Sequence, residues 1–308
     1  MKLIHVSRLV LLSGAMSLGC AAVAQVEGPI ATRVIVRAES KTDAAVLHAA
    51  DVQLEIGGHA AAITAFQPLM SARGPRVEVA LLIDDGLRSS FGLQLKELEK
   101  FVADTASPNV AEGVGYMQNG RAIFPAGFST EAEVATKAIR VPLAAVGVSA
   151  SPYFCLSDLL KHWPTSGDAA HVVLMITDGN DPYNGAAVPS NQDSPYVDTA
   201  VRDAQRAGVP VYSIYFGRRE VNSEFGSLSG QSYLQQVAEG TGGKSFNIGS
   251  INPVSIAPYL KEFERALRES YLMKFQTDAR KSERLKISTK VDGVKLRAQE
   301  ETLPAKAR

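Results

Sequence analysis

Cysteine is almost absent from this chain of 308 residues, which contains only Cys20 and Cys155. Cys20 lies in an N-terminal segment that we predict to be removed, so a single cysteine remains in the mature protein. One cysteine excludes an internal disulfide, and the fold must therefore be stabilised by its hydrophobic core. We interpret Cys155 as a small buried apolar residue, with an intermolecular bridge or a reactive thiol as the alternative.

The chain also lacks a surplus of either charge. It has 32 basic and 32 acidic residues, and removal of Lys2 and Arg8 with the N-terminal segment leaves 30 basic residues against 32 acidic ones. No basic patch suggests nucleic acid as a partner, and no polybasic segment suggests an anionic membrane.

Recognisable catalytic motifs are missing as well. No Gly-x-Ser-x-Gly nucleophile elbow occurs. Ala238 to Ser245 is similar to a phosphate-binding loop, but Ala238 stands where the first glycine belongs, and the loop is predicted to run from a helix to a strand. We therefore expect no nucleotide. The histidines after the N-terminal segment show no paired metal-binding spacing: they are His48, His59, His162 and His171.

The longest apolar run lies at the N-terminus and is typical of a secretory signal peptide. Positive charge at Lys2 and Arg8 precedes the run, and Ala22-Val23-Ala24 forms an A-x-A cleavage site. We expect a signal peptide over residues 1–24, export to the periplasm or beyond the cell, and no transmembrane span in the mature chain. Gly19-Cys20 leaves a lipid anchor through Cys20 as an alternative.

Short apolar runs alternate with amphipathic stretches between residues 75 and 270. The runs Val77 to Ile83, His171 to Thr177 and Val209 to Phe216 have the composition of strands buried on both faces. Strands separated by helices predict parallel pairing. The fold class expected here is α/β, with a doubly wound, mostly parallel sheet.

Both ends of the mature chain are rich in extended patterns. Residues 25–74 contain alternating segments around a turn at Gly57-Gly58, and residues 271–308 contain further extended segments around Asp292-Gly293. We expect the tail to return to the N-terminal segment and to form a small β-rich accessory unit with it.

Helix ends carry weaker signals. Ser89 or Ser90 suits a cap of the helix after the first buried run, and Thr130 with Glu133 suits a capping box. Gly240 is expected to end the helix that contains Tyr233.

Two of the buried runs end in carboxylates. Asp84 and Asp85 follow the first run, and Asp178 follows the second and precedes Gly179. Because the carboxyl ends of parallel strands meet at one edge of a sheet, these acids are expected to share a site. Asp-Gly pairs are also common turn residues, which is the simpler interpretation of either pair alone.

These residues resemble the von Willebrand factor type A domain. That family has a metal-ion-dependent adhesion site, with Asp-x-Ser-x-Ser after its first strand, a Thr from a second loop and an Asp from a third. Asp84 occupies the first position and Asp178, in ITDGND, the last. The flanking segments Leu47 to Leu69, Glu239 to Phe246 and Lys286 to Gln299 are similar to those of an exported bacterial subgroup. The resemblance implies Asp84 and Asp178 as metal ligands.

The sequence departs from the family at the hydroxyl positions. Gly86 and Arg88 replace the two serines, and the threonine position falls on Phe154, with Ser151 as the nearest hydroxyl. Mg²⁺ requires near-octahedral oxygen coordination, so the adhesion site is interpreted as degenerate. We hypothesise that the guanidinium of Arg88 replaces the cation between Asp84 and Asp178; the alternative is that Arg88 points into solvent.

The expected function is that of a non-catalytic, exported, protein-binding module without a cofactor, whose partner is a protein of the cell envelope or outside the cell. The alternatives are metal-dependent binding, with Mg²⁺ or another divalent cation on Asp84 and Asp178, a metal-assisted hydrolase that uses Asp84, Asp85 and Asp178, and a structural subunit of an envelope assembly. The predicted partner-binding edge consists of Asp85, Arg88, Ser151, Asn180 and Asp181.

Overall fold

The computed structural model describes residues 30–40, 46–143, 151–185, 193–217, 224–247 and 252–303, without the side chains of 224–227. The predicted signal peptide, its cleavage site and Cys20 lie outside these residues. Within the described helices, none is long and apolar enough to cross a membrane.

A six-stranded sheet forms the centre of the molecule, with the strand order β10-β9-β8-β5-β6-β7. All pairs are parallel except that of β6 with β7, which are joined by a turn at Asn119-Gly120. Every residue of β5 is buried. The prediction of a doubly wound, mostly parallel sheet is confirmed. The strands are β5 (Val77–Asp84), β6 (Val110–Gln118), β7 (Arg121–Ile123), β8 (Ala170–Thr177), β9 (Val211–Tyr215) and β10 (Ser245–Phe246).

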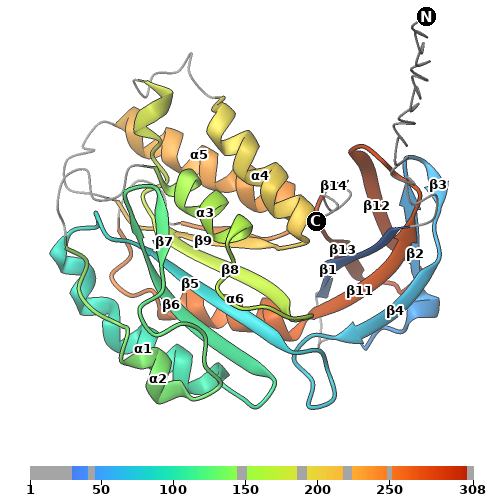
Figure 1. The fold of residues 1–308 in the computed structure, drawn as a ribbon, viewed down its shortest axis with the longest axis horizontal. Coiled ribbons are helices and arrows are strands. Elements are labelled where there is room, and N and C mark those ends of the chain that lie inside the picture. Colours follow the sequence, from blue (N-terminus) through green and yellow to red (C-terminus); the bar gives the residue numbers. More distant parts are fainter. Residues whose placement is uncertain are drawn as a thin grey trace, which may run out of the picture.

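Helices cover both faces of this sheet (Figure 1). One apolar core joins the sheet to α1 (Leu95–Thr105), α2 (Ala132–Thr136) and α6 (Ala257–Arg268). A second core on the opposite face joins it to α3 (Pro152–Lys161), α4 (Pro195–Ala207) and α5 (Glu224–Thr241). This layering explains why the strand sequences are almost wholly apolar. Three short 3₁₀ helices are η1 (Ala49–Asp51), η2 (Ser89–Gln94) and η3 (Pro182–Asn184).

The two ends of the chain build two four-stranded antiparallel sheets beside the central domain (Figure 1). β1 pairs with β11 in the first sheet, and β2 pairs with β12 in the second. An apolar core that includes Val34, Met273, Leu54 and Leu285 lies between the two sheets. The predicted accessory β unit is confirmed. Its strands are β1 (Ile30–Ser40), β2 (Val52–Ile56), β3 (His59–Ala60), β4 (Ile63–Pro68), β11 (Ser270–Thr277), β12 (Glu283–Thr289), β13 (Val294–Arg297) and β14 (Glu301–Thr302).

The turn around Asp292-Gly293 joins strands of different sheets. β13 pairs with β1, whereas β12 pairs with β2 and β14, so the two strands diverge instead of forming a hairpin. The boundaries at residues 74/75 and 270/271 stay predictions.

Three expectations about helix ends were wrong. Neither Ser89 nor Ser90 caps α1, because η2 occupies those residues and α1 begins only at Leu95. α2 begins after Glu131, which makes no side-chain cap, so Thr130 forms no capping box. α5 continues through Gly240 to Thr241 and ends at Gly242, whose φ of 81° lies in the left-handed region that favours glycine.

Candidate functional site at the carboxyl edge of the sheet

Asp84 and Asp178 lie at the ends of neighbouring strands, as predicted. β5 and β8 pair in register up to Ile83 and Ile176. The hydroxyl of Thr177 donates to Asp84 Oδ2 over 2.8 Å, and the Gly86 amide donates to Asp84 Oδ1 over 2.8 Å. The Thr177 hydroxyl oxygen also accepts the Gly179 amide at 3.2 Å. Thr177, which the sequence did not suggest as a site residue, therefore connects Asp84 to the Asp178 loop.

Asp85 belongs to a different part of the edge. Its carboxylate forms a bidentate pair with Arg140, at 2.7 Å from Nη1 to Oδ1 and 2.8 Å from Nη2 to Oδ2. The Leu143 amide and the Gln118 side chain also donate to it, over 2.9 Å and 2.6 Å. The Arg140 guanidinium stacks on the Tyr116 ring, 3.7 Å from its centroid. Asp85 is thus held on the β6 side, away from the contacts of Asp84.

The electrostatics of this pair agree with its geometry. Burial raises the pKa of the Asp85 carboxyl, but the hydrogen bonds from Arg140, Leu143 and Gln118 outweigh that effect and leave the pKa below its usual range. The hydrogen bond to Asp85 raises the pKa of Arg140. Arg140 was missed from the sequence because 55 residues separate it from Asp85.

The predicted role of Arg88 was wrong. Its Nε donates to the carbonyl of Gly217 over 3.2 Å, and among the described residues it forms no ion pair with Asp84 or Asp178. The half-buried side chain also does not simply point into solvent, because this hydrogen bond joins the turn after β5 to the segment after β9. Arg140 is the arginine that pairs with Asp85 at this edge.

Three of the residues predicted to contact a partner are buried. Asp85 and Ser151 have no exposed surface, and Asp181 is 5% exposed. Ser151 caps α3 by accepting the Tyr153 amide, and Asp181 accepts the Tyr183 amide and the Ser194 hydroxyl. These three predictions of direct contact were wrong, because each side chain serves the fold.

The remaining predicted residues are Asp178, a predicted metal ligand, and Asn180 of the predicted partner-binding edge. The Asn180 amide donates to Asp178 Oδ1 over 3.0 Å, and Asn180 is half-buried. The adjacent Gly179 has a φ of 68°, and a Cβ there would lie 2.4 Å from the Gly230 carbonyl oxygen of α5. Only glycine permits this close approach, which fixes the loop after β8 against the helix.

The described residues do not fit the divalent cation that the resemblance implies. Both Asp84 oxygens accept hydrogen bonds, Gly86 provides no side-chain oxygen, and the Ser151 oxygen is engaged as a helix cap. No group of three or more His, Cys, Asp or Glu side chains suitable for a metal occurs in the described part of the chain. The described residues therefore supply too few oxygen ligands for the six-fold coordination of Mg²⁺.

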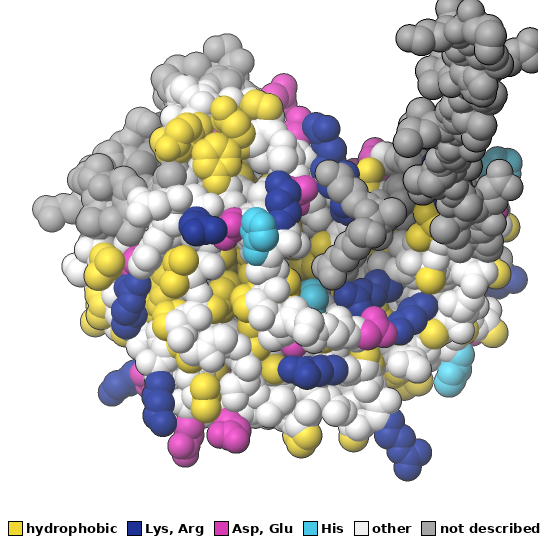
Figure 2. All heavy atoms as spheres, viewed as in Figure 1, with side chains coloured by type: hydrophobic (Ala, Val, Ile, Leu, Met, Phe, Trp, Pro, Cys, Tyr) yellow, Lys and Arg dark blue, Asp and Glu magenta, His cyan; other side chains and the backbone are white. Residues whose placement is uncertain are grey.

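An aromatic cluster lies where the family has its threonine. The ring of Phe154, at the start of α3, is 5.0 Å from the ring of Tyr183 and 4.9 Å from that of Tyr196, measured between centroids. Tyr183 is 56% exposed. Figure 2 shows hydrophobic side chains gathered over the start of α4, the part of the surface to which Tyr196 belongs. We call Phe154, Tyr183 and Tyr196 the aromatic cluster.

Removal of the Arg140 guanidinium should destabilise the protein. In Arg140→Ala the Asp85 carboxylate stays buried without its charged partner, and we expect a loss of about 2 kcal/mol in the free energy of unfolding at neutral pH. The loss should shrink in acid, as Asp85 becomes protonated. Urea unfolding at several pH values measures it. Arg121→Ala, which removes an exposed arginine on β7, is the control; equal losses in both variants would contradict the assigned role.

Comparison with known proteins gives distant likenesses of fold. No protein-family profile and no curated protein matches the chain. A von Willebrand factor type A protein from Catenulispora acidiphila aligns with a TM-score of 0.45 and 11% identity, over 90% of this chain and 74% of that one. The conserved hypothetical protein BatB from Bacteroides thetaiotaomicron aligns with a TM-score of 0.44 and 12% identity, over 62% of this chain and 97% of the BatB chain. The PilB minor pilin from Streptococcus sanguinis aligns with a TM-score of 0.44 and 15% identity, over 65% of this chain and 63% of the pilin chain.

These likenesses are too distant to transfer a function, and the strand order of the chain itself describes a doubly wound sheet. Counted from β5, the central sheet has the order 3-2-1-4-5-6, with an antiparallel third strand and acids at the carboxyl ends of the first and fourth strands. This order belongs to the doubly wound, mostly parallel sheet that the sequence predicted. The chain has a von Willebrand factor type A-like fold with an accessory β unit made from its two ends.

Proposed function

We propose that the chain is a non-catalytic, exported, protein-binding module that uses the carboxyl edge of its sheet without a divalent cation. The observation that carries the proposal is the aromatic cluster: the exposed Tyr183 packs on Phe154, which in turn packs on Tyr196. Tyrosine is enriched among the residues that dominate binding energy at protein interfaces.

Cation-independent binding follows from the donors around the acids. A family member would use a bound ion to attract an acidic side chain of its partner. Here Asp84 accepts hydrogen bonds from Thr177 and Gly86, and Asp85 from Arg140, Gln118 and Leu143. The partner is therefore expected to contact the aromatic cluster directly.

The non-catalytic part of the proposal rests on the same contacts. A metal-assisted hydrolase would need the carboxylates of Asp84, Asp85 and Asp178 to face the substrate. There they would bind a metal ion or transfer a proton. Asp85 and Asp178 have no exposed surface, and Asp85 is held in its ionised form by the Arg140 pair. A phosphoester activity dependent on Asp84 would overturn this part.

The test is capture of envelope proteins on the immobilised mature chain, with and without EDTA. We expect the same identified proteins in both samples, and a loss of at least about tenfold in their affinity for Tyr183→Ala, the cost of losing a central interface aromatic. Val46→Ala, a truncation of another exposed apolar side chain (76% exposed), is the matched control. Loss of capture in EDTA would contradict the proposal. So would equal affinity of the captured proteins for the wild type, Tyr183→Ala and Val46→Ala.

A further inference from the structure

The connection between α3 and β8, residues 163–169, is held against the start of β5 by a buried carboxylate. The Trp163 indole N–H donates to Glu78 Oε2 over 2.8 Å, and the Thr165 hydroxyl donates to the same oxygen. Glu78 is only 1% exposed. We call residues 163–169 the strap. Because two of its side chains donate to one buried, charged oxygen, the position of its first half depends on that oxygen.

The far end of the strap contacts the accessory β unit. The Asp168 carboxylate pairs with Arg33 of β1 at 2.7 Å and with Lys274 of β11 at 2.8 Å. The Asp168 side chain is 73% exposed, and ion pairs at such positions contribute little to stability. The strap therefore joins the central domain to the accessory unit, and the buried contacts at Glu78 are the stronger of its two attachments.

A histidine contacts both the strap and Glu78. Nε2 of His171, at the start of β8, lies 3.4 Å from the Glu78 oxygen that the strap uses. Its imidazole stacks on the Trp163 indole, with 4.0 Å between the ring centroids and 9° between the planes. The His171 side chain is 13% exposed. One ring thus lies against the carboxylate that holds the strap and against the indole that the strap contributes.

A positive charge on His171 strengthens both of these contacts. Histidine is the residue type whose charge changes between about pH 5 and pH 8. The charged imidazole is attracted to the Glu78 carboxylate and to the face of the indole. Burial raises the pKa of the Glu78 carboxyl, but hydrogen bonds from His171, Thr165 and Trp163 lower it more, to about 2, so this partner stays ionised throughout.

The other charged groups beside His171 keep their charge over the same range. Arg76 lies 3.1 Å from Glu78 Oε1, the oxygen that the strap does not use. The hydrogen bond from Lys274 holds the pKa of Asp168 below its usual range. Loss of the His171 charge therefore weakens the contacts at Oε2, while Arg76 still compensates the buried carboxylate.

We propose that His171 is a pH-sensitive latch for the strap: its charged ring holds residues 163–169 closed on Glu78, and its neutral ring lets them open. The strap is closed at the acidic end of the histidine range and opens more often at the alkaline end. Opening removes the hydrogen bonds of Trp163 and Thr165 to Glu78, and with them the buried attachment of this link between the two units. The latch does not depend on the proposed binding function.

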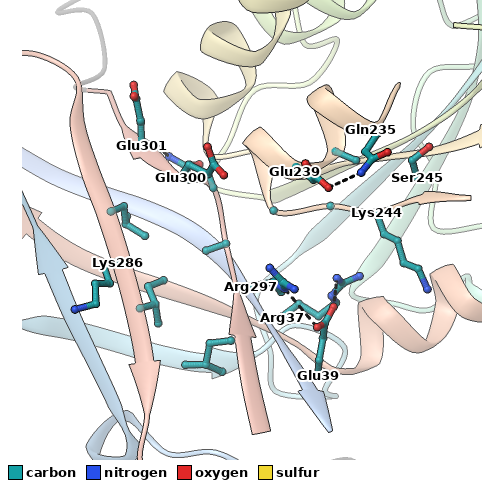
Figure 3. A pocket seen from close by; sticks show the side chains of 18 of the residues that line it. Arg37, Glu39, Gln235, Glu239, Lys244, Ser245, Lys286, Arg297, Glu300 and Glu301 are labelled. Carbon is teal, nitrogen blue, oxygen red and sulfur yellow. Dashed lines mark hydrogen bonds and ion pairs between the residues drawn. The ribbon is translucent and has the colours of Figure 1, made fainter. Parts of the chain in front are cut away.

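A second contact region between the two units has no such histidine. The cleft between them has a volume of about 980 Å³ and is lined by β12, β13 and the end of α5 (Figure 3). Its charged side chains have both signs, and Arg37 and Arg297 pair there with Glu39. No histidine is among its described lining residues. Protonation of histidine should therefore tighten the strap and leave the cleft unchanged.

Trp163 is the only tryptophan of the chain, so its fluorescence reports on the strap. Acrylamide, a neutral quencher, measures how accessible the indole is to solvent. For the mature chain we expect a quenching constant at least about twofold larger at about pH 8 than at about pH 5. The single indole N–H resonance should also be better protected from exchange at the acidic end, after correction for the intrinsic exchange rate. If His171 only fills space beside the indole, both quantities stay constant, and that result would overturn the proposal.

Two histidine variants separate the latch from other effects of pH. His171→Gln keeps a side-chain donor but carries no charge, so its quenching constant should be equal at both pH values. His162→Gln is the matched control, because His162 precedes Trp163 and pairs with Asp158 at the surface, with 71% of its side chain exposed; it should keep the wild-type difference. Both variants retain Glu112, so its titration produces no difference between them. A pH dependence that persists in His171→Gln, or that disappears in His162→Gln, would contradict the latch.

Discussion

Glu112→Gln is expected to gain stability over the wild type as pH rises. The difference in free energy of unfolding between the variant and the wild type should grow by about 3 kcal/mol from acid to neutral pH. Glu112 lies near the start of β6 with no exposed surface. Burial raises the pKa of its carboxyl to about 8, and the hydrogen bond with Thr105 lowers the pKa by less. The unfolded chain ionises this group near its ordinary value of 4.5. Between these two values the folded protein must keep a proton that the unfolded chain releases, so stability falls as pH rises.

Glutamine removes this dependence because it is neutral in both states. The Thr105 hydroxyl also lies 2.7 Å from the Phe101 carbonyl, so it can donate there and accept a hydrogen bond from a protonated Glu112 or from the amide of a glutamine. Chemical unfolding of the variant and the wild type should give curves that separate from pH 4.5 to pH 8 and run parallel above. Glu133→Gln, at an exposed position, is the control. A difference that does not change with pH would contradict the assigned protonation.

Glu78→Gln is expected to have the opposite effect, a loss of about 3 kcal/mol at neutral pH. Glu78, at the start of β5, is 1% exposed. Burial raises the pKa of its carboxyl, but hydrogen bonds from His171, Thr165 and Trp163 together lower it more, to about 2. Arg76 lies 3.1 Å away. Stability from this group is complete above pH 4.5 and is lost as pH falls through about 2.

The measurement for Glu78 is the free energy of unfolding from neutral pH into acid. The wild type should lose its advantage over Glu78→Gln as pH falls below 4.5, and the two should approach each other near pH 2. Glu55→Gln, which removes an exposed partner of Lys286, should cost less than about 1 kcal/mol. If Glu55→Gln and Glu78→Gln cost the same, the buried network does not hold Glu78 in its ionised form.

The architecture could be predicted from the sequence because it depends on local patterns. Val77–Asp84 and Ala170–Thr177 are mostly apolar, apart from Glu78, Asp84, His171 and Thr177, which favours burial on both faces and so helices on both sides. Asn119-Gly120 adopts the positive φ angles of its turn. Helix starts were predicted poorly because α1 and α2 lack side-chain caps, and packing of Leu98 and Ala135 against the core determines where these helices lie.

The site could be predicted only where strand order determined it. The neighbouring positions of Asp84 and Asp178 follow from parallel pairing of β5 with β8. The pairing of Asp85 with Arg140 depends on how the segment after α2 returns to the sheet, and the sequence has no local signal for this. Arg88 was assigned to the acids because it is close to them in sequence, but its side chain contacts Gly217. The aromatic cluster combines residues from η3, α3 and α4 and has no pattern of its own.

Titration of the mature chain with Mg²⁺, Mn²⁺ and Ca²⁺ by calorimetry tests most directly whether the edge works without a cation. Asp84→Ala is the matched variant, because Asp84 would be a ligand in a family-type site. Since the described residues offer too few free oxygen ligands, we predict no binding heat at micromolar to millimolar ion and identical traces for the two proteins. Micromolar binding by the wild type that is lost in Asp84→Ala would contradict the account.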